Sequence, residues 1–472
     1  MDGSTVPRGG PVIDASSAFI LLVTIVAFFL PLFIIFPPIP PSKREAVLDT
    51  HSQIGLGPSE SGLRGHHTGD DAGHSAVKSQ GGSQNGSQKG TQNGSNAKSQ
   101  GKIRSLWIYP IKSCKGIEVR QSKVLPTGLE FDRLFTFAQL KSPFPVGLQA
   151  SGDEKGAHAW HFITQRQFPL LATIQVELFV PDIIKARGHA SKVSEPFLLV
   201  RFPWQERGLR GVLGLVAAKL ARGWRARPEK EFVLPVAFPP QDEIDARGYA
   251  HEEVTIWRDT VTALNMETEL PRELALYLGV SNRLGLFRID PARLRNVYRC
   301  APAKHDAGYQ PVAGFQDAYP LHLLNLSSVR DFDAKIDKDE ALRVLDPRRF
   351  RANIIIDGGD TPYEEETWKK IRLIPGPGNK HESSTFHVSC RTVRCKLPNV
   401  DPDNGYRHPV EPDRSLRKHR EVDEGAKLMG CMGMQLTPLF SKTDSPEDLE
   451  SWVEVGMSVG VLERGHHVYI RQ

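Results

Sequence analysis

The sequence predicts an α+β, β-rich fold that is preceded by a transmembrane helix and a disordered linker. Residues 15–36 are uncharged and almost entirely apolar. Residues 79–100 consist mainly of Gly, Ser, Gln and Asn, which supply too little apolar surface to fold. From residue 103 onward, short runs of alternating apolar and polar residues recur between turn-forming residues. Short strands at this spacing are typical of β-barrels and sandwiches.

Composition limits the function classes. The chain has 472 residues, 39% hydrophobic and 24% charged, which suits a globular protein of about two or three domains. Its net charge of +5 is too small for a nucleic-acid-binding signature, but it is consistent with an anionic ligand or a membrane surface. The cysteines are odd in number and scattered, which predicts a reducing compartment rather than a disulfide framework. They include no CxxC pair and no zinc-finger spacing, so a structural zinc site is not expected.

The apolar run at residues 15–36 predicts a single-span anchor after a short tail at residues 1–14. About 20 apolar residues span a bilayer, whereas the apolar core of a signal peptide has about 7–15. A removable signal peptide is the alternative, but no small-x-small cleavage site follows the run. Lys43 and Arg44 follow the run and only Arg8 precedes it, so the positive-inside rule places the C-terminal part in the cytosol.

Residues 37–102 are expected to form a disordered linker. Four histidines lie in it, and they are expected to be solvated rather than metal-binding: His51, His66, His67 and His74.

The ordered part is expected to begin with strands at residues 103–110, 119–125, 134–137, 162–164 and 171–179. Residues 181–250 are less regular. Within them, residues 208–222 predict a short amphipathic helix, which is either a surface insertion near a membrane or a packed helix.

The C-terminal half is expected to contain two helices, at residues 269–278 and 329–336, the second capped by Ser327 or Ser328. The alternation of apolar residues predicts strands at residues 253–257, 350–358, 368–373, 386–390, 432–436 and 455–462.

Residues 386–405 form the candidate functional segment. A strand at its start is followed by Cys395, and the turn formers Asp401–Gly405 close it. Arg391 and Arg394 flank Cys395, and neighbouring guanidinium groups favour the thiolate, which attacks electrophiles and binds soft metals. Most cysteines in proteins behave as small buried apolar residues. A functional role for Cys395 therefore needs support from other segments of the chain.

Several segments resemble the MOSC proteins. Tyr109–Gly116, Gly128–Phe135 and Thr164–Gln167 resemble the N-terminal β-barrel, while Phe350–Gly358 and Arg394–Gly405 resemble the MOSC domain. Their order is similar to that of the mitochondrial amidoxime-reducing component family, over about residues 103–180 and 250–465. The resemblance implies an N-terminal MOSC β-barrel domain at 103–265 with an insertion at about 181–250, and a MOSC β-barrel domain with peripheral helices at 266–472.

The resemblance also implies a molybdenum–molybdopterin cofactor (Moco) in a basic cleft. Cys395 matches the catalytic metal ligand, and Asp360 matches an acidic position that supplies a proton. Six residues match positions that hold the cofactor: Lys112, Ser113 and Arg133 at its phosphate end, and Arg351, Asn353 and Arg394 on the opposite wall. Val393 departs from the family, which has a serine two residues before the metal-binding cysteine, and Ala352 replaces a proline.

The function implied is that of a membrane-anchored molybdenum oxidoreductase that reduces N-hydroxylated substrates and faces the cytosol. The chain has no haem, flavin or iron–sulfur motif, so electrons are expected from a cytochrome b5 and its NADH-dependent reductase. The mitochondrial outer membrane is the expected location, with the endoplasmic reticulum as the alternative.

Two other functions stay open. One is a MOSC carrier of sulfur or cofactor, and the other is a scaffold that has lost the metal. Pyridoxal phosphate binding also accompanies MOSC domains, although no pyridoxal-phosphate domain with its lysine motif precedes this one.

Overall fold

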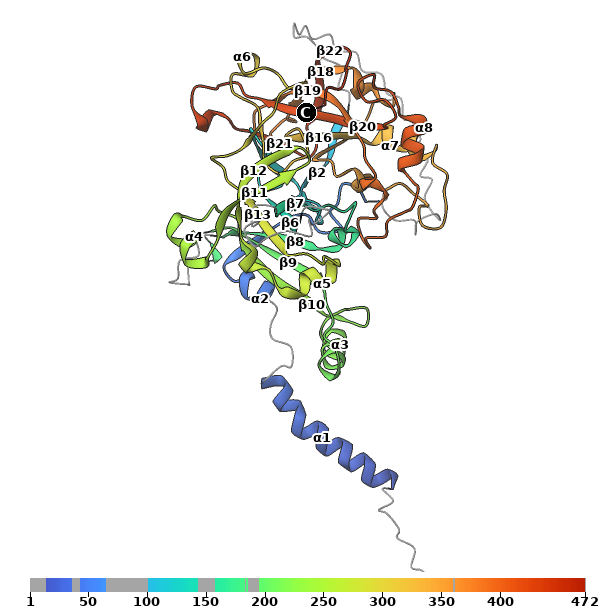
Figure 1. Cartoon of the computed structure of the whole chain (residues 1–472). Coiled ribbons are helices and arrows are strands. Elements are labelled where there is room, and N and C mark those ends of the chain that lie inside the picture. Colours follow the sequence, from blue (N-terminus) through green and yellow to red (C-terminus); the bar gives the residue numbers. More distant parts are fainter. Residues whose placement is uncertain are drawn as a thin grey trace, which may run out of the picture. The chain divides into compact units, whose positions relative to one another are not determined.

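The computed structural model describes residues 14–35, 43–64, 101–142, 158–182, 184–185, 195–359 and 361–471 (Figure 1). The chain divides into two compact units. One comprises residues 1–47 and 203–229, and the other comprises residues 48–202 and 230–472.

The first unit is helical. Helix α1 (Ala15–Ile35) forms over the apolar run, and α3 (Leu209–Arg222) forms where an amphipathic helix was predicted. Gly223, with a φ of 94°, ends α3. Among the described residues, no helix combines the length and apolarity that crossing a membrane requires.

The second unit contains a five-stranded closed barrel with the strand order β11-β12-β13-β6-β7. Its strands are β6 (Phe135–Lys141), β7 (Ala159–Phe162), β11 (Ala250–Ile256), β12 (Asp259–Asn265) and β13 (Leu284–Ile289). Trp160 and Phe287 meet edge to face in its core, with ring centroids 5.3 Å apart. Apolar side chains that alternate along the strands therefore fill the interior of the barrel, as is usual for small barrels.

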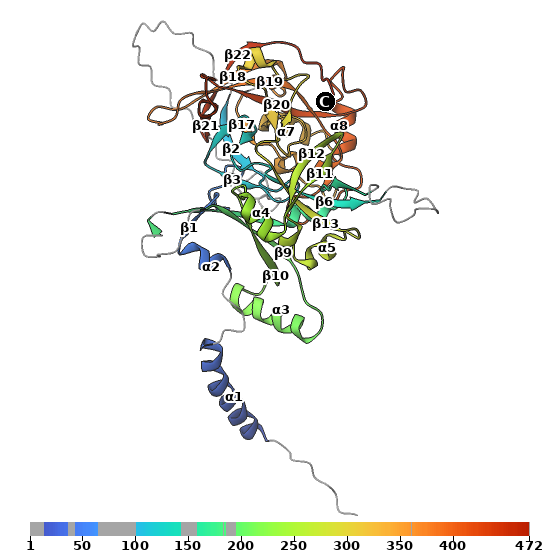
Figure 2. The same ribbon diagram turned by 60° about the vertical axis from the view of Figure 1, so that its left-hand side comes forward.

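The second unit also contains an eight-stranded sheet with the order β17-β16-β20-β19-β18-β22-β2-β3. Strand β17 pairs in addition with β2, so the sheet closes on itself (Figure 2). Its strands are β2 (Lys102–Ile108), β3 (Ile117–Val119), β16 (Leu321–Asn325), β17 (Ile354–Asp357), β18 (Trp368–Ile374), β19 (Ser384–Val393), β20 (Cys431–Leu439) and β22 (Ser458–Arg464). Strand β2, from the N-terminal half, thus completes a sheet built mostly from the C-terminal half, while β13, beyond residue 265, belongs to the other barrel.

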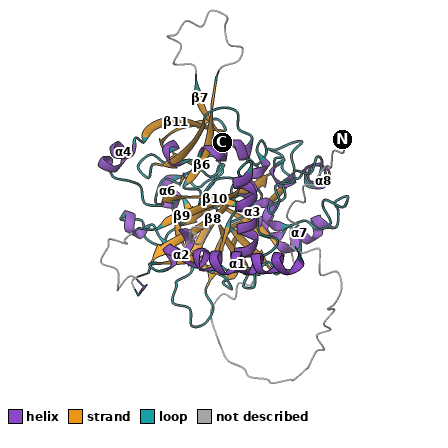
Figure 3. Ribbon diagram, turned by 90° about the horizontal axis from the view of Figure 1, so that it is seen from below, coloured by secondary structure: helices purple, strands orange, loops and turns teal. Residues whose placement is uncertain are grey.

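Smaller sheets and short helices make up the remaining elements. A four-stranded sheet has the order β1-β8-β9-β10, and Figure 3 shows its last three strands side by side. The remaining strands are β1 (His51–Ile54), β4 (Gln121–Leu125), β5 (Gly128–Leu129), β8 (Gln175–Pro181), β9 (Phe197–Pro203), β10 (Glu229–Pro235), β14 (Arg295–Asn296), β15 (Val312–Ala313) and β21 (Ser451–Glu454). The remaining helices are α2 (Lys43–Leu48), α4 (Gln241–Arg247), α5 (Arg272–Leu278), α6 (Lys304–Ala307), α7 (Leu326–Asp333) and α8 (Asp413–His419).

The prediction of a disordered linker is wrong for residues 43–64. Strand β1 pairs antiparallel with β8, and Leu63 is fully buried in the core. His51, expected to be solvated, is buried, and its Nε2 lies 3.2 Å from the carbonyl oxygen of Glu195. The linker prediction applied to residues 43–64 a composition that belongs to residues 79–100. Strand β1 is an edge strand of four residues, which is too short to show a periodic pattern of apolar and polar residues.

Residues 181–250, which were expected to be less regular, contain the strands β9 and β10 and the helix α4 in addition to α3. The predicted strand at 171–179 begins instead with a 3₁₀ helix, Pro169–Thr173. Helix α7 begins after Asn325, whose side chain accepts a hydrogen bond from the Ser327 N–H, so neither predicted serine is the cap. The bounds of these strands and helices are therefore set by pairing between distant strands, or by a local side-chain hydrogen bond such as that of Asn325.

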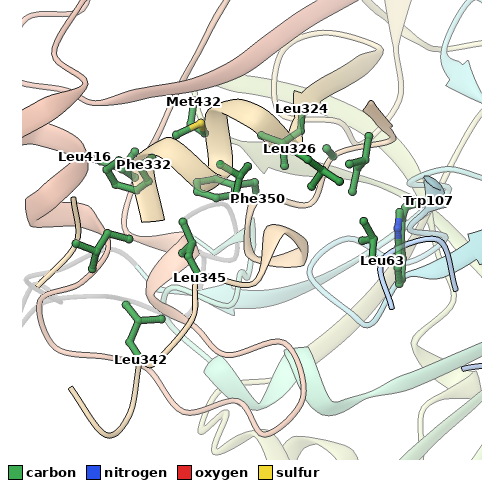
Figure 4. Packing of buried hydrophobic residues seen from close by; sticks show 14 of the residues in the cluster. Leu63, Trp107, Leu324, Leu326, Phe332, Leu342, Leu345, Phe350, Leu416 and Met432 are labelled. Atoms are coloured by element: carbon green, nitrogen blue, oxygen red, sulfur yellow. The ribbon is translucent and has the colours of Figure 1, made fainter. Parts of the chain in front are cut away.

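A buried cluster packs α7 against the eight-stranded sheet (Figure 4). Phe332 of α7, Phe350 and Met432 are buried in it. Phe350 ends the 3₁₀ helix Pro347–Phe350, which is capped by Asp346, whose side chain accepts from the Arg348 N–H at 2.8 Å. Arg351 follows with a φ of 53°, a left-handed conformation that turns the chain toward β17. Because Phe350 is held in the buried cluster, the position of the predicted site residue Arg351, which follows it, is fixed as well.

Candidate functional site

A cavity of about 520 Å³ lies between the two barrels of the second unit, which both supply its wall. The described residues that line it include seven of the eight predicted site residues: Lys112, Ser113, Arg133, Arg351, Asn353, Arg394 and Cys395. Asp360, the eighth, lies outside the described residues. The lining residues extend from Lys112 to Arg471 in the chain, so the fold assembles the site from distant parts of the sequence.

Cys395 lies where strand β19 has ended. Val393 is the last residue of β19 and is paired with Cys431, and the Arg394 N–H donates to the Gly430 carbonyl at 2.8 Å. The next residues enter the 3₁₀ helix Leu397–Asn399. Cys395 is half-buried on the cavity wall and forms no disulfide. The end of the strand thus presents a thiol to the cavity.

The two arginines that flank Cys395 have different surroundings. Arg391 forms ion pairs with Glu366 at 2.9 Å and with Asp423 at 3.1 Å. Arg394 donates to the Phe350 carbonyl at 3.1 Å, and its guanidinium lies 5.4 Å from the centre of the Phe350 ring. Arg391 is therefore neutralised by carboxylates, and Arg394 is the flanking cation that stays available to a ligand.

Lys112 also lines the cavity and is almost fully buried. Its Nζ donates to the Phe315 carbonyl at 2.7 Å and to Asp317 at 2.5 Å. Burial lowers the pKa of Lys112 to about 8, against the opposing effect of the Asp317 carboxylate. Two of its three N–H donors have protein partners, so one is left for a ligand.

Ser113 has a φ of 68° and is buried beside Lys112. Its carbonyl accepts a hydrogen bond from Gln165 Nε2 at 2.7 Å. Gln165 belongs to the segment Thr164–Gln167 that carried part of the family resemblance. This segment thereby holds the turn that places Lys112 and Ser113.

Arg133 and Arg351 both lie against the ring of Tyr109, with guanidinium carbons 4.8 and 4.1 Å from its centre. Arg133 pairs with Asp132 and donates to the Arg351 carbonyl at 3.1 Å. Arg351 donates to the Cys114 carbonyl at 2.7 Å. Burial lowers the pKa of Arg351 to about 10, and the charge of Arg133 contributes to that shift. Two cations held this close favour an anion beside them.

Asn353 uses its whole side chain within the protein. Its Nδ2 donates to the Trp107 carbonyl at 3.1 Å, and its Oδ1 accepts from the His322 N–H at 3.2 Å. Arg133 Nη1 lies 3.4 Å from the same oxygen. Asn353 therefore joins two strands of the sheet and positions Arg133.

Three polar groups on the cavity wall are buried and lack a hydrogen-bond partner in the described structure: Arg351 Nη2, Arg394 Nε and Thr392 Oγ1. A buried polar group without a partner costs about 1–3 kcal/mol. Two of the three are guanidinium N–H donors, which suit the oxygens of a phosphate. The residues present fit an anionic, phosphate-bearing cofactor.

The charge of the lining agrees with this fit. Among the described lining residues the acidic ones are Asp259 and Asp317, and the basic ones are Lys112, Arg133, Arg166, Arg258, Arg351, Arg391, Arg394, Lys427 and Arg471. The described residues contain no group of three or more His, Cys, Asp or Glu side chains that could hold a metal ion. Among the described lining residues, Cys395 is the one with a thiol, a side chain that suits a soft metal.

Some lining residues were not predicted. Asp317 accepts hydrogen bonds from Lys112 and from Trp257 Nε1, the latter at 3.0 Å, and the guanidinium of Arg166 lies 4.5 Å from the centre of the Trp257 ring. His322 is buried, and burial lowers its pKa well below the usual range. Of these residues, only Arg166 could have been predicted from the sequence, because it lies within the family-like segment Thr164–Gln167. Asp317, Trp257 and His322 lie in polar or apolar runs without a recognisable motif.

Two family models match the chain. The MOSC N-terminal beta barrel domain matches residues 100–197, and the MOSC domain matches residues 310–459. Mitochondrial amidoxime reducing component 2 of Rattus norvegicus is 24% identical over 353 residues, covering 74% of this chain and 80% of its own length. The Homo sapiens protein of the same name is 22% identical over 352 residues, covering 74% of this chain and 81% of its own length.

Molybdenum cofactor sulfurase of Arabidopsis thaliana is 23% identical over 367 residues, which cover 76% of this chain but only 35% of the sulfurase. The shared region therefore corresponds to one part of the sulfurase and to most of the amidoxime reducing components. Together with the two matched domains, these similarities show that the chain belongs to the MOSC-domain proteins.

Proposed function

We propose that this protein is a molybdenum-cofactor oxidoreductase that reduces N-hydroxylated substrates of the amidoxime or hydroxylamine type. The observation that carries the proposal is a half-buried Cys395 on the wall of a basic cavity, beside buried arginine N–H groups that lack partners. The similarity to proteins named amidoxime reducing components supports the same reaction class.

The residues of the cavity take distinct roles in this proposal. Lys112 and Arg133 bind the phosphate end of the cofactor, with Ser113 in the same turn. Arg351, which lies beside Arg133, and Arg394 supply further N–H donors. Cys395 provides a thiolate ligand, which suits the soft metal. Asn353 is a positioning residue, since its side-chain bonds are made within the protein.

The reaction balances as an N–OH group plus two electrons and two protons giving N–H and water. When bound, the cofactor supplies the two-electron redox chemistry at molybdenum. A separate redox protein, of the cytochrome b5 type with an NADH-dependent reductase, supplies the electrons. Asp360 remains the predicted proton donor, outside the described residues.

The proposed location is the mitochondrial outer membrane, with residues 15–36 as the anchor and the cavity on the cytosolic side. The apolar composition of α1 supports an anchor, and the word "mitochondrial" in the names of the relatives supports the organelle. Imaging a fluorescent fusion beside markers of mitochondria and the endoplasmic reticulum tests this. A secreted product would contradict the orientation.

The test of the activity is metal content followed by turnover. The full chain is purified from a host that makes molybdopterin, and molybdenum, pterin and amidoxime reduction with an artificial electron donor are measured. Near-stoichiometric molybdenum is expected, and Cys395→Ser should abolish reduction. Cys300→Ser is the matched control, because Cys300 is also partly buried but does not line the cavity. A folded parent protein that holds neither molybdenum nor pterin would refute the proposal.

A carrier of sulfur or cofactor is the second candidate, favoured by the similarity to molybdenum cofactor sulfurases. In that case Cys395 would hold a persulfide, and the purified protein would contain labile sulfur but reduce no amidoxime. Pyridoxal phosphate binding stays a prediction, which release of the cofactor by denaturation would test.

A further inference from the structure

Helix α3 presents its large apolar side chains to solvent. Leu209, Val212, Leu213, Val216 and Leu220 are all exposed, Leu209 and Leu220 by 83% and 82%. With about 3.6 residues per turn, these five positions share one stripe of the helix, roughly 100° wide. A helix that packs on a globular core turns such a stripe inward.

The opposite side of α3 is lined by small residues. Gly211 and Ala218 are buried, and they lie two turns apart on the side away from the apolar stripe. A Cβ added at Gly211 would lie 1.8 Å from the carbonyl oxygen of Glu206, so only glycine fits there. The small residues therefore lie on the buried side of α3, and its apolar stripe lies on the exposed side.

The segment that contains α3 carries only positive charge. Residues 207–227 contain six basic residues and no acidic residue: Arg207, Arg210, Lys219, Arg222, Arg225 and Arg227. Trp224 follows the helix and is 82% exposed, with Lys219 Nζ 4.5 Å from the centre of its ring. Leucines on one side, basic residues around them and a tryptophan at the end are typical of helices that lie in the surface of an anionic bilayer.

We infer that residues 207–227 form a membrane-binding element that inserts the stripe Leu209, Val212, Leu213, Val216 and Leu220, together with Trp224, into the surface of an anionic bilayer. This site is distinct from the cavity and from α1, although α1 belongs to the same compact unit. Basic residues attract anionic headgroups, and the apolar stripe then enters the boundary between headgroups and acyl chains. If α1 anchors the chain in a membrane, α3 stays close to the lipid surface, and this high local concentration favours its binding.

The experiment follows Trp224 in the full chain. The chain contains seven tryptophans, so the fluorescence of Trp224→Phe is subtracted to isolate this one. Phosphatidylcholine vesicles with brominated acyl chains are compared with vesicles that also contain phosphatidylserine. We expect quenching of Trp224 in the anionic vesicles at least about threefold greater than in the neutral ones, because binding requires both charge and apolar insertion. Arg225→Gln with Arg227→Gln should reduce this difference.

The apolar contribution is tested with Leu213→Asp and Leu220→Asp together, which should remove the quenching. Leu276→Asp is the matched control, since Leu276 of α5 is 70% exposed and Leu213 is 68% exposed. Circular dichroism confirms that each variant is folded. Equal quenching in both vesicle types, no quenching, or quenching unchanged by the double variant would overturn the inference. None of these readouts depends on molybdenum or on reductase activity.

Discussion

Replacing Asn353 with alanine should destabilise the second unit more than any surface substitution of the same kind. The Asn353 amide is 1% exposed and spans two strands, with Nδ2 3.1 Å from the Trp107 carbonyl of β2 and Oδ1 3.2 Å from the His322 N–H of β16. Alanine removes both bonds and leaves both backbone groups buried. Arg133 keeps its bonds to Asp132 and to the Arg351 carbonyl.

The magnitude follows from these two groups. Each buried backbone group that loses its partner costs about 1–3 kcal/mol, so Asn353→Ala should lower the free energy of unfolding by about 2–6 kcal/mol. Because natural domains have only about 5–15 kcal/mol of stability, this is a large share of the total. For a slope near 3 kcal/mol/M in urea, a loss of about 3 kcal/mol moves the midpoint by about 1 M.

Urea unfolding, followed by circular dichroism and by tryptophan fluorescence, measures the effect. Asn379→Ala is the matched control, because Asn379 lies in a partly exposed turn, where its side chain accepts from the His381 N–H at 3.0 Å and donates to the Glu454 carboxylate. It should lose less than about 1 kcal/mol. If the two alanine variants shifted the midpoint equally, Asn353 would not join the strands as described.

Three further predictions concern charge and packing. Burial lowers the pKa of Lys112 to about 8, so Lys112 is charged at pH 7 and neutral above about pH 9. Sulfate binding, measured by calorimetry, should weaken roughly tenfold over that range, since a hydrogen bond to a charged group contributes about 1.5–3 kcal/mol. Leu63→Ala should cost about 2–5 kcal/mol in urea unfolding, because Leu63 is fully buried in the core. Glu366→Gln should cost about 3–5 kcal/mol in thermal unfolding, because it leaves Arg391 and Arg420 buried without their shared carboxylate.

Each of the three has a control. Lys112→Arg should bind sulfate equally at pH 7 and 9, and a persistent decrease would assign the titration to another group. Leu48→Ala, at a 36% exposed position of α2, should cost far less than Leu63→Ala. Glu364→Gln breaks a more exposed ion pair with Arg464 and should cost no more than about 1 kcal/mol; equal losses in the two glutamine variants would contradict the network around Glu366.

The sequence alone determined the features that depend on neighbouring residues. The apolar run produced a helix at Ala15–Ile35, and alternation predicted β18 and β19 to within a few residues. Local periodicity and turn formers suffice for this, since both act over a few positions. The site residues came instead from a resemblance to a family, because no spacing within the chain relates Lys112 to Arg351 or Cys395.

Only the tertiary structure decided what joins distant residues. It paired β1 with β8, which made an ordered strand of a segment predicted as linker. It gave Arg391 two buried carboxylates and left Arg394 Nε without a hydrogen-bond partner among the described residues, although both arginines lie near the same cysteine in the sequence. It also turned the apolar side of α3 outward. Burial and ion pairing depend on contacts between residues far apart in the chain, so a pattern read along the chain does not contain them.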